Sequence, residues 1–241
     1  MDYKMIIAGY PLYYRFRYER TADYFREFIV PADEKGESVI EASEEYIKWS
    51  AKTYDANLPY AEVMSCLSLT SNALIPFGYC SFHSVAVSVN GKGYLFAAKS
   101  GVGKSTQYMN LKTLYPENIQ VINGDKPFLR FTDGKVIIYP SPWRGKENFG
   151  NDIVCELDSI IFLEQAHENT LEKMKPEKAV LKSLKQFLYY PDSEKIIHMV
   201  CDLDRRLLTD IPVYLFRNTG DLTSSDLLYK KLLADGDAFY E

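Results

Sequence analysis

A strand hairpin that runs directly into a glycine-rich loop and a helix constrains the fold more than any other feature of the sequence. Residues 84–89 (SVAVSV) alternate with a period of two, and residues 94–98 (YLFAA) form a second β-like run. The NGKG segment at 90–93 supplies turn residues that accept positive φ, which predicts a hairpin. The loop 99–106 (KSGVGKST) follows, and a helical pattern then covers residues 106–115.

The loop carries a phosphate-binding pattern. The sequence AKSGVGKS fits G-x-x-x-x-G-K-[ST], except that Ala98 stands at the first glycine position. Gly101 and Gly103 let consecutive backbone N–H groups converge on phosphate oxygens. Lys104 would then reach the β and γ oxygens, and Ser105 would offer its hydroxyl to Mg²⁺. The competing interpretation is a glycine-rich turn with a surface lysine. The predicted nucleotide-binding residues are Ala98, Lys99, Ser100, Gly101, Val102, Gly103, Lys104, Ser105 and Thr106.

The context of this loop separates classes of nucleotide-binding protein. In an ordinary nucleotide hydrolase the strand before the loop lies in a parallel sheet, whereas the hairpin here makes its predecessor an antiparallel neighbour. That arrangement disfavours a simple GTPase. The L-S-G-G-Q signature of transporter ATPases is also missing from the sequence.

The rest of the chain alternates between strand and helix patterns. The first 75 residues predict strands near 5–10 and 13–20, a polar break at 31–38, a helix after Ser43, and a helix at 60–74. The later residues predict further strands and helices, and the closing helix has Ser224 or Ser225 near its N-cap. The later strands are expected at 119–122, 128–131, 136–139, 159–164 and 213–218, and the later helices at 177–190 and 192–209.

Composition and charge favour a packed globular protein and exclude a basic nucleic-acid binder. With 46% hydrophobic and 14% aromatic residues among 241, the chain has ample material for a packed core. Its 28 basic and 33 acidic residues give a formal net charge of −5, the wrong sign for binding nucleic acid by phosphate neutralisation. Local positive charge comes from Lys104, Lys126, Arg144 and Lys146, which is enough to bind a phosphate group but not a polynucleotide.

The cysteines and the hydropathy pattern bear on compartment. Cys66, Cys80, Cys155 and Cys201 are widely spaced, which predicts reduced core residues and neither a zinc site nor a redox pair. No run approaches the roughly 18 apolar residues of a membrane span, and the first residues lack the pattern of a secretory leader. We therefore expect a cytoplasmic location, with no membrane partner.

Three segments together resemble a known family. FHSVAVSVNGKGYLFAAKSGVGKST at 82–106, INGDKPFLRF at 122–131 and YPSPWRGKE at 139–147 resemble the catalytic domain of HPr kinase/phosphorylase, whose fold is shared with phosphoenolpyruvate carboxykinase. The resemblance is specific over about residues 80–146. His83 precedes Lys104 by 104 − 83 = 21 residues, which is the spacing in that family.

The resemblance implies a fold and a domain division. The expected class is α/β, with a mixed, largely antiparallel sheet that carries the phosphate loop in residues 76–241. A mixed α+β portion of residues 1–75 would pack against it.

The resemblance also implies an activity, namely a kinase that transfers the γ-phosphoryl group of ATP to a hydroxyl, with serine of a protein or peptide as the expected acceptor. Asp125 would act as general base and, with Ser105, hold Mg²⁺. His83 would orient the phosphates or the base, and Arg144 or Lys146 would stabilise charge on the transferred group. An oligomer is compatible with this family.

Two positions depart from the family pattern, and some alternatives stay open. Gly124 stands where the first of two aspartates is expected, and Ala98 replaces the first loop glycine. Loss of one carboxylate leaves open a nucleotide-binding regulator without catalysis, and the fold also permits a small-molecule kinase. Glu164, at the end of the SIIFLE run, is an alternative strand-end acid for Mg²⁺. Trp143 either stacks on adenine or packs its own loop.

Overall fold

The structure is a computed structural model that describes residues 2–31 and 39–234. The polar break predicted at 31–38 lies outside the described residues except for its first residue. Within the described part, no helix is both long and apolar enough to cross a membrane. The cysteines are free, with Cys66 and Cys80 buried as predicted, whereas Cys155 is half-buried and Cys201 is exposed.

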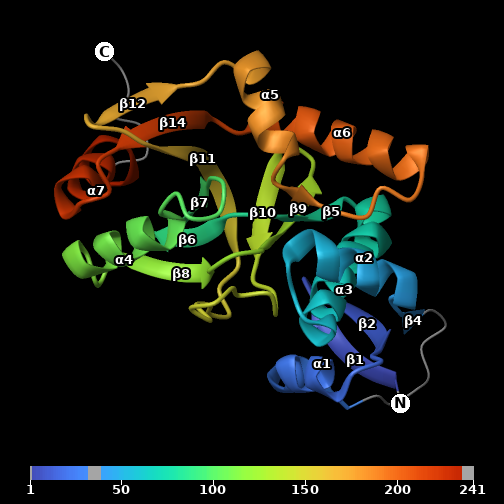
Figure 1. Ribbon diagram of the computed structural model, residues 1–241. Helices are drawn as coiled ribbons and strands as arrows, with labels where there is room; N and C mark the ends of the chain where they lie inside the picture. The colour runs from blue at the N-terminus through green and yellow to red at the C-terminus, as the bar shows by residue number, and fades with distance from the viewer. Residues whose placement is uncertain (1, 32–38, 235–241) are drawn as a thin grey trace.

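The N-terminal part combines a small sheet with helices (Figure 1). Its sheet has the strand order β3-β1-β2-β4, and the predicted helix after Ser43 is confirmed, with Ser43 Oγ accepting a hydrogen bond of 3.1 Å from the Tyr46 amide. The predicted helix at 60–74 is also confirmed and begins two residues earlier. The elements are β1 (Asp2–Ile7), β2 (Tyr10–Arg15), α1 (Glu19–Tyr24), η1 (Arg26–Phe28), β3 (Ile29–Val30), β4 (Val39–Ile40), α2 (Glu44–Tyr54) and α3 (Leu58–Leu74).

The remaining strands form one large mixed sheet. Most neighbours are antiparallel, and β11 is parallel to both β7 and β14. The strand order is β13-β5-β9-β10-β11-β7-β6-β8, with β14 pairing β11 and β12 pairing β14. The strands are β5 (Tyr79–Phe82), β6 (Val85–Val89), β7 (Lys92–Ala97), β8 (Ile119–Asn123), β9 (Phe128–Thr132), β10 (Lys135–Tyr139), β11 (Cys155–Gln165), β12 (Thr170–Lys173), β13 (Phe187–Leu188) and β14 (Val213–Asn218).

Helices cover both faces of this sheet, so its central strands are apolar on both sides. Ala86, Leu95 and Phe162 face a core that α5 (Pro176–Leu184) and α6 (Glu194–Asp210) close. Their chain neighbours Val87, Phe96 and Ile161 face the opposite core. The second core is closed by α4 (Lys104–Leu114), α7 (Leu222–Leu228) and η3 (Tyr229–Leu233) (Figure 1).

Three local expectations are wrong in detail. The helix predicted at 177–190 ends at Leu184, because Phe187 and Leu188 pair with β5 as strand β13. In the hairpin, only Asn90 and Gly91 have positive φ, whereas Gly93 lies in β7, where a Cβ would stand 2.6 Å from Ile138 Cδ1. The closing helix is capped by the Asp221 carboxylate, which accepts a hydrogen bond from the Ser224 amide.

A third core joins the N-terminal part to the large sheet. The Trp143 side chain is 1% exposed and contacts the Phe25 ring edge-on at a centroid distance of 5.3 Å. Its indole Nε1 donates a hydrogen bond of 2.9 Å to the Val63 carbonyl oxygen of α3. Trp143 therefore packs its own loop. The domain boundary predicted after residue 75 falls inside η2 (Ile75–Phe77), and the division into two domains stays a prediction.

The anchoring role of Trp143 predicts a large loss of stability on truncation. Trp143→Ala should lower the free energy of unfolding by about 3–5 kcal/mol, measured by urea denaturation, because it leaves a cavity and removes a buried hydrogen bond. The control is Trp49→Ala, at the only other tryptophan, whose side chain is 53% exposed. Equal losses for the two variants would contradict the anchoring role.

Candidate functional site

The glycine-rich loop connects β7 to α4 in the predicted order of strand, loop and helix. Gly101 has φ 81° and Gly103 has φ 113°, conformations that glycine adopts without strain. Gly103 is the N-cap residue of α4, so the first amide groups of that helix face the loop. A helix N-terminus of this kind offers unpaired N–H groups and a positive dipole end to an anion.

Lys104 folds back over the loop that precedes it. The residue is 8% exposed, and its Nζ donates a hydrogen bond of 3.1 Å to the Ala98 carbonyl oxygen. Burial lowers the pKa of Lys104 and nearby Lys126 lowers it further, whereas Asp125 and Glu147 act in the opposite direction. The negative charge of a phosphate group nearby would favour the protonated form of Lys104.

Asp125 is held at the end of β8 by a buried side-chain amide. The Oδ1 atom of Asn123 accepts hydrogen bonds from the backbone amides of Asp125 and Lys126, at 2.9 and 2.7 Å. The Nδ2 group of Asn123 donates to the carbonyl oxygen and hydroxyl of Ser141. Such a side-chain turn fixes the direction in which the chain leaves the strand.

The Asp125 carboxylate is paired on both oxygens. His83 Nε2 lies 3.3 Å from Oδ1, and the Lys126 ammonium contacts Oδ2. Burial opposes ionisation of Asp125, but the hydrogen bond from His83 and the charge and hydrogen bond of Lys126 together lower its pKa to about 2. Asp125 is therefore a carboxylate at neutral pH.

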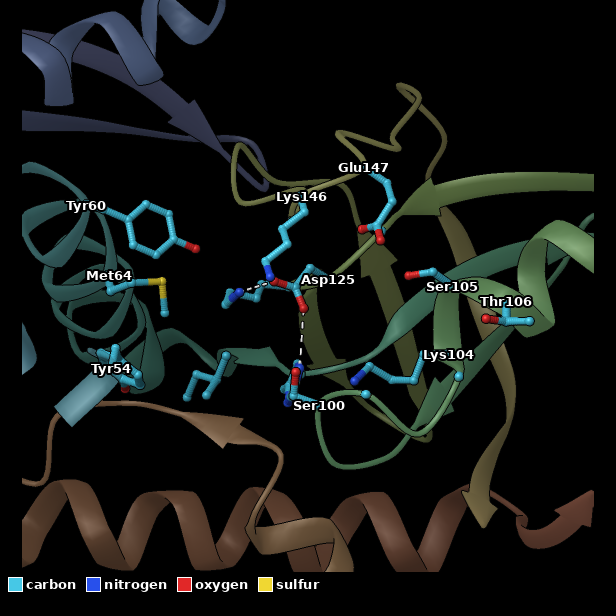
Figure 2. A pocket seen from close by; sticks show the side chains of 17 residues that line it. Tyr54, Tyr60, Met64, Ser100, Lys104, Ser105, Thr106, Asp125, Lys146 and Glu147 are labelled. Carbon is cyan, nitrogen blue, oxygen red and sulfur yellow. Dashed lines mark hydrogen bonds and ion pairs between the residues drawn. The ribbon is translucent and has the colours of Figure 1, made fainter. Parts of the chain in front are cut away.

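These groups line one cavity of about 650 Å³. Figure 2 shows Lys104 and Ser105 on one side of Asp125, and Tyr54, Tyr60 and Met64 on the other. The second side comes from α2 and α3, so the cavity is walled by both parts of the chain. The cavity is lined by Tyr54, Tyr60, Met64, His83, Ser100, Gly101, Gly103, Lys104, Ser105, Thr106, Gly124, Asp125, Lys126, Gly145, Lys146, Glu147 and Leu188.

Several predicted site residues do not reach the cavity. Among the predicted nucleotide-binding residues, Ala98, Lys99 and Val102 are not part of its lining. The Arg144 guanidinium lies over the Phe28 ring, with Cζ 4.8 Å from the ring centroid, whereas its alternative Lys146 does line the cavity.

Glu164, the alternative strand-end acid, also lies outside the cavity. Its carboxylate pairs with Lys182 at 2.5 Å and with Arg217 at 3.4 Å. A hydrogen bond from Lys182, with the charge of Arg217 added, lowers the pKa of Glu164. The carboxylate therefore belongs to an ion-pair group at the surface.

Gly124 has a packing reason to be glycine. Its N–H donates a hydrogen bond of 2.9 Å to the Phe149 carbonyl oxygen. A Cβ atom at this position would stand 2.8 Å from the Arg144 carbonyl oxygen and 3.1 Å from Phe149. The loop that follows β10 therefore occupies the space that a side chain at position 124 would need.

The sequence alone did not indicate the wall formed by Tyr54, Tyr60 and Met64. These residues lie on helices of a segment without a recognisable motif, and only tertiary packing brings them to the loop. Asn123 was not predicted as a site residue, although an asparagine side chain commonly bonds the backbone amide two residues on and so favours a turn.

The donor set fits a magnesium ion that arrives with a nucleotide. Within the described ranges, no group of three or more His, Cys, Asp or Glu side chains could hold a metal ion. Mg²⁺ commonly uses one or two carboxylates together with substrate phosphates and water. The predicted ligands Ser105 and Asp125 line the same cavity, together with Glu147.

Comparisons with known proteins find similarity to solved structures. No family model matches the chain. No curated protein matches it either. The solved structure of the HPr(Ser) kinase/phosphatase from Coxiella burnetii is similar with a TM-score of 0.38 and 14% sequence identity, covering 62% of this chain and 94% of that one. Membership of the family stays a prediction.

The packing of Gly124 predicts a cost for any side chain there. Gly124→Ala should lower the free energy of unfolding by about 1–3 kcal/mol in urea denaturation, because the added Cβ meets backbone that must shift. Gly134→Asn is the control, since a Cβ at Gly134 meets nothing within 4 Å and asparagine tolerates its φ of +73°. An unchanged stability of Gly124→Ala would contradict the packing reason.

The low pKa of Asp125 predicts an acid-dependent contribution to stability. Because the folded-state value of about 2 lies below the ordinary 3.8, ionised Asp125 stabilises the fold above about pH 4, and this gain is lost as pH falls toward 2. Between pH 7 and pH 2, Asp125→Asn should lose about 2 kcal/mol less stability than the unmodified protein. Asp152→Asn, which changes an exposed carboxylate outside the cavity, should keep the original pH dependence. Parallel pH profiles for the unmodified protein and Asp125→Asn would contradict the assignment.

Proposed function

We propose that the protein is an ATP-dependent phosphotransferase that moves the γ-phosphoryl group to a hydroxyl group, with serine of a protein or peptide as the acceptor. One observation carries the proposal. The N-terminus of α4, the buried Lys104 and an ionised Asp125 face the same cavity, which therefore joins a phosphate-binding surface to a proton acceptor. These are the parts that phosphoryl transfer requires, since positioning and charge stabilisation supply most of its catalysis.

The nucleotide phosphates would bind at the loop and the start of α4. Gly101 and Gly103 expose backbone N–H groups there, and the Lys104 ammonium would exchange its hydrogen bond to Ala98 for the β and γ oxygens. Ser105 is the expected ligand for Mg²⁺, and Asp125 adds negative charge beside it. When bound, Mg²⁺ would neutralise charge on the β- and γ-phosphates.

Asp125 would accept the proton of the acceptor hydroxyl. In the step, the hydroxyl oxygen forms a bond to the γ-phosphorus, the bond to the β–γ bridging oxygen breaks, and ADP leaves while the proton passes to the carboxylate. A pKa of about 2 makes Asp125 a weak base. A weak base suffices because the transition state is loose and the O–H bond is largely intact until late. His83, at 3.3 Å, orients the carboxylate.

The acceptor would approach from the side of the cavity that α2 and α3 form. Figure 2 places Tyr54, Tyr60 and Met64 beyond Asp125 as seen from Ser105 and Thr106. Since the γ-phosphate is the end of the nucleotide that meets Lys104, the opposite wall is left for the group that attacks it. This placement supports an acceptor site in the N-terminal part.

Two substitutions separate nucleotide binding from transfer. Lys104→Ala should weaken ATP binding by about 10- to 100-fold, measured by calorimetry, because it removes a charged hydrogen bond to phosphate. Asp125→Asn should retain ATP binding while phosphorylation of serine-containing peptides falls by about 100-fold or more. Lys92→Ala, which removes an exposed lysine at the hairpin, is the control for lost positive charge and should leave both unchanged.

The same measurements decide between the proposed enzyme and its competitors. Normal transfer by Asp125→Asn would show that another group is the base. Tight Mg–ATP binding with no transfer to any peptide, protein or small hydroxyl compound would instead favour a nucleotide-binding regulator. Transfer to small hydroxyl compounds alone would favour a small-molecule kinase.

A further inference from the structure

The loop after β10 does more than exclude a side chain at position 124. It leaves β10 at Tyr139, places the backbone of Arg144 and Phe149 against Gly124, and returns to β11. The same loop carries Glu147, which lines the cavity. A carboxylate side chain at position 124 is therefore excluded by packing, and the loop that excludes it brings the Glu147 carboxylate to the same cavity.

Glu147 sits on a defined turn. The Asn148 amide donates a hydrogen bond of 3.4 Å to the Gly145 carbonyl oxygen, which places Lys146 and Glu147 at the two central positions. Gly145 has φ 78° and lies against Asp125, since a Cβ on it would stand 2.9 Å from the Asp125 Cβ. The turn thus fits directly over the proposed base.

Both ends of the loop are fastened to the sheet. The Ser141 hydroxyl donates a hydrogen bond of 2.6 Å to the Lys126 carbonyl oxygen. At the other end, Asn151 Nδ2 donates a hydrogen bond of 2.9 Å to the Val121 carbonyl oxygen, and Asn123 and Gly150 form an isolated β-bridge. The position of Glu147 is therefore set by hydrogen bonds to the sheet on either side of an exposed tip.

The Glu147 carboxylate points toward the phosphate side of the cavity. Figure 2 shows it directed from the loop toward the region of Ser105. It is near enough to Lys104 to act electrostatically on that ammonium and raise its pKa. In the part of the chain that the structure describes, Glu147 forms no hydrogen bond or ion pair with another side chain. Both oxygens of Asp125, by contrast, are engaged by His83 and Lys126.

We propose that Glu147 is the second carboxylate for the divalent cation that accompanies the nucleotide, in the place of an acid that position 124 cannot hold. The proposal rests on the proposed function, since the cation enters with ATP. Mg²⁺ takes hard oxygen ligands and is commonly held through one or two carboxylates. Ser105 and Glu147 would flank it, leaving Asp125 to its partners and to the acceptor proton.

The test measures ATP affinity with and without metal. In calorimetry, Mg²⁺ should tighten ATP binding to the unmodified protein, and Glu147→Gln should reduce this tightening by about tenfold. In EDTA, Glu147→Gln should bind ATP as well as the unmodified protein or more tightly, because a negative charge near the phosphates has been removed. A merely structural role would weaken binding under both conditions.

A matched variant and a direct probe complete the experiment. Asp152→Asn removes an exposed carboxylate from the same loop outside the cavity, and it should keep the full effect of Mg²⁺. With Mn²⁺ and ATP, the electron paramagnetic resonance signal of bound Mn²⁺ should be retained in Asp152→Asn and reduced in Glu147→Gln.

The outcomes separate this inference from the proposed function. Retained ATP binding with an unchanged Mg²⁺ effect in Glu147→Gln would overturn the role of Glu147 alone. Failure of the unmodified protein to bind ATP, with or without metal, would overturn the proposed function and the role of Glu147 with it. An equal loss of the Mg²⁺ effect in Asp152→Asn would mean general electrostatics and would also overturn the assignment.

Discussion

The candidate site depends on the hydrogen bonds of one buried amide, the side chain of Asn123. Its Oδ1 atom accepts hydrogen bonds from the backbone amides of Asp125 and Lys126. Its Nδ2 group donates to the carbonyl oxygen and the hydroxyl of Ser141 in the loop after β10. A fully buried amide that left these groups unpaired would cost about 1–3 kcal/mol for each. Asn123 therefore fixes both the turn after β8, which contains Asp125, and the start of the loop that contains Glu147.

The second constraint is steric and follows from the first. Once the loop is fastened at Ser141, its backbone returns across the end of β8, and only glycine fits beneath it at position 124. The glycine that departs from the family pattern thus has a cause in this chain's own packing. An aspartate introduced at this position would disturb the loop before it could supply a ligand, so Gly124→Asp would not test catalysis.

The local order of strands and helices around the glycine-rich loop could be predicted from the sequence because hydrophobic period, turn residues and glycines all agree there. The hairpin at 85–97, the helix that follows and the strand at 213–218 need no distant partner to be recognised. The short strand β13 could not be predicted, since two residues become a strand only by pairing with β5. Lys104, Asp125 and His83 line the same cavity, and the roles that the family resemblance implies for them stay predictions. Arg144 does not join them, because its side chain finds the Phe28 ring of the N-terminal part, a contact that no local pattern encodes.

The cavity is a seam between two stretches of chain that are far apart in sequence. One wall comes from the glycine-rich loop and the start of α4, and the opposite wall comes from Tyr54, Tyr60 and Met64. The Trp143 indole spans the seam, hydrogen-bonded to α3 while its backbone belongs to the loop of Glu147. Any contact that loosens α3 from this indole would act on the turn of Glu147 and on the wall of Tyr54, Tyr60 and Met64 at once. Under the proposed function, a protein that docks on the N-terminal helices would therefore be a candidate both for substrate and for regulator.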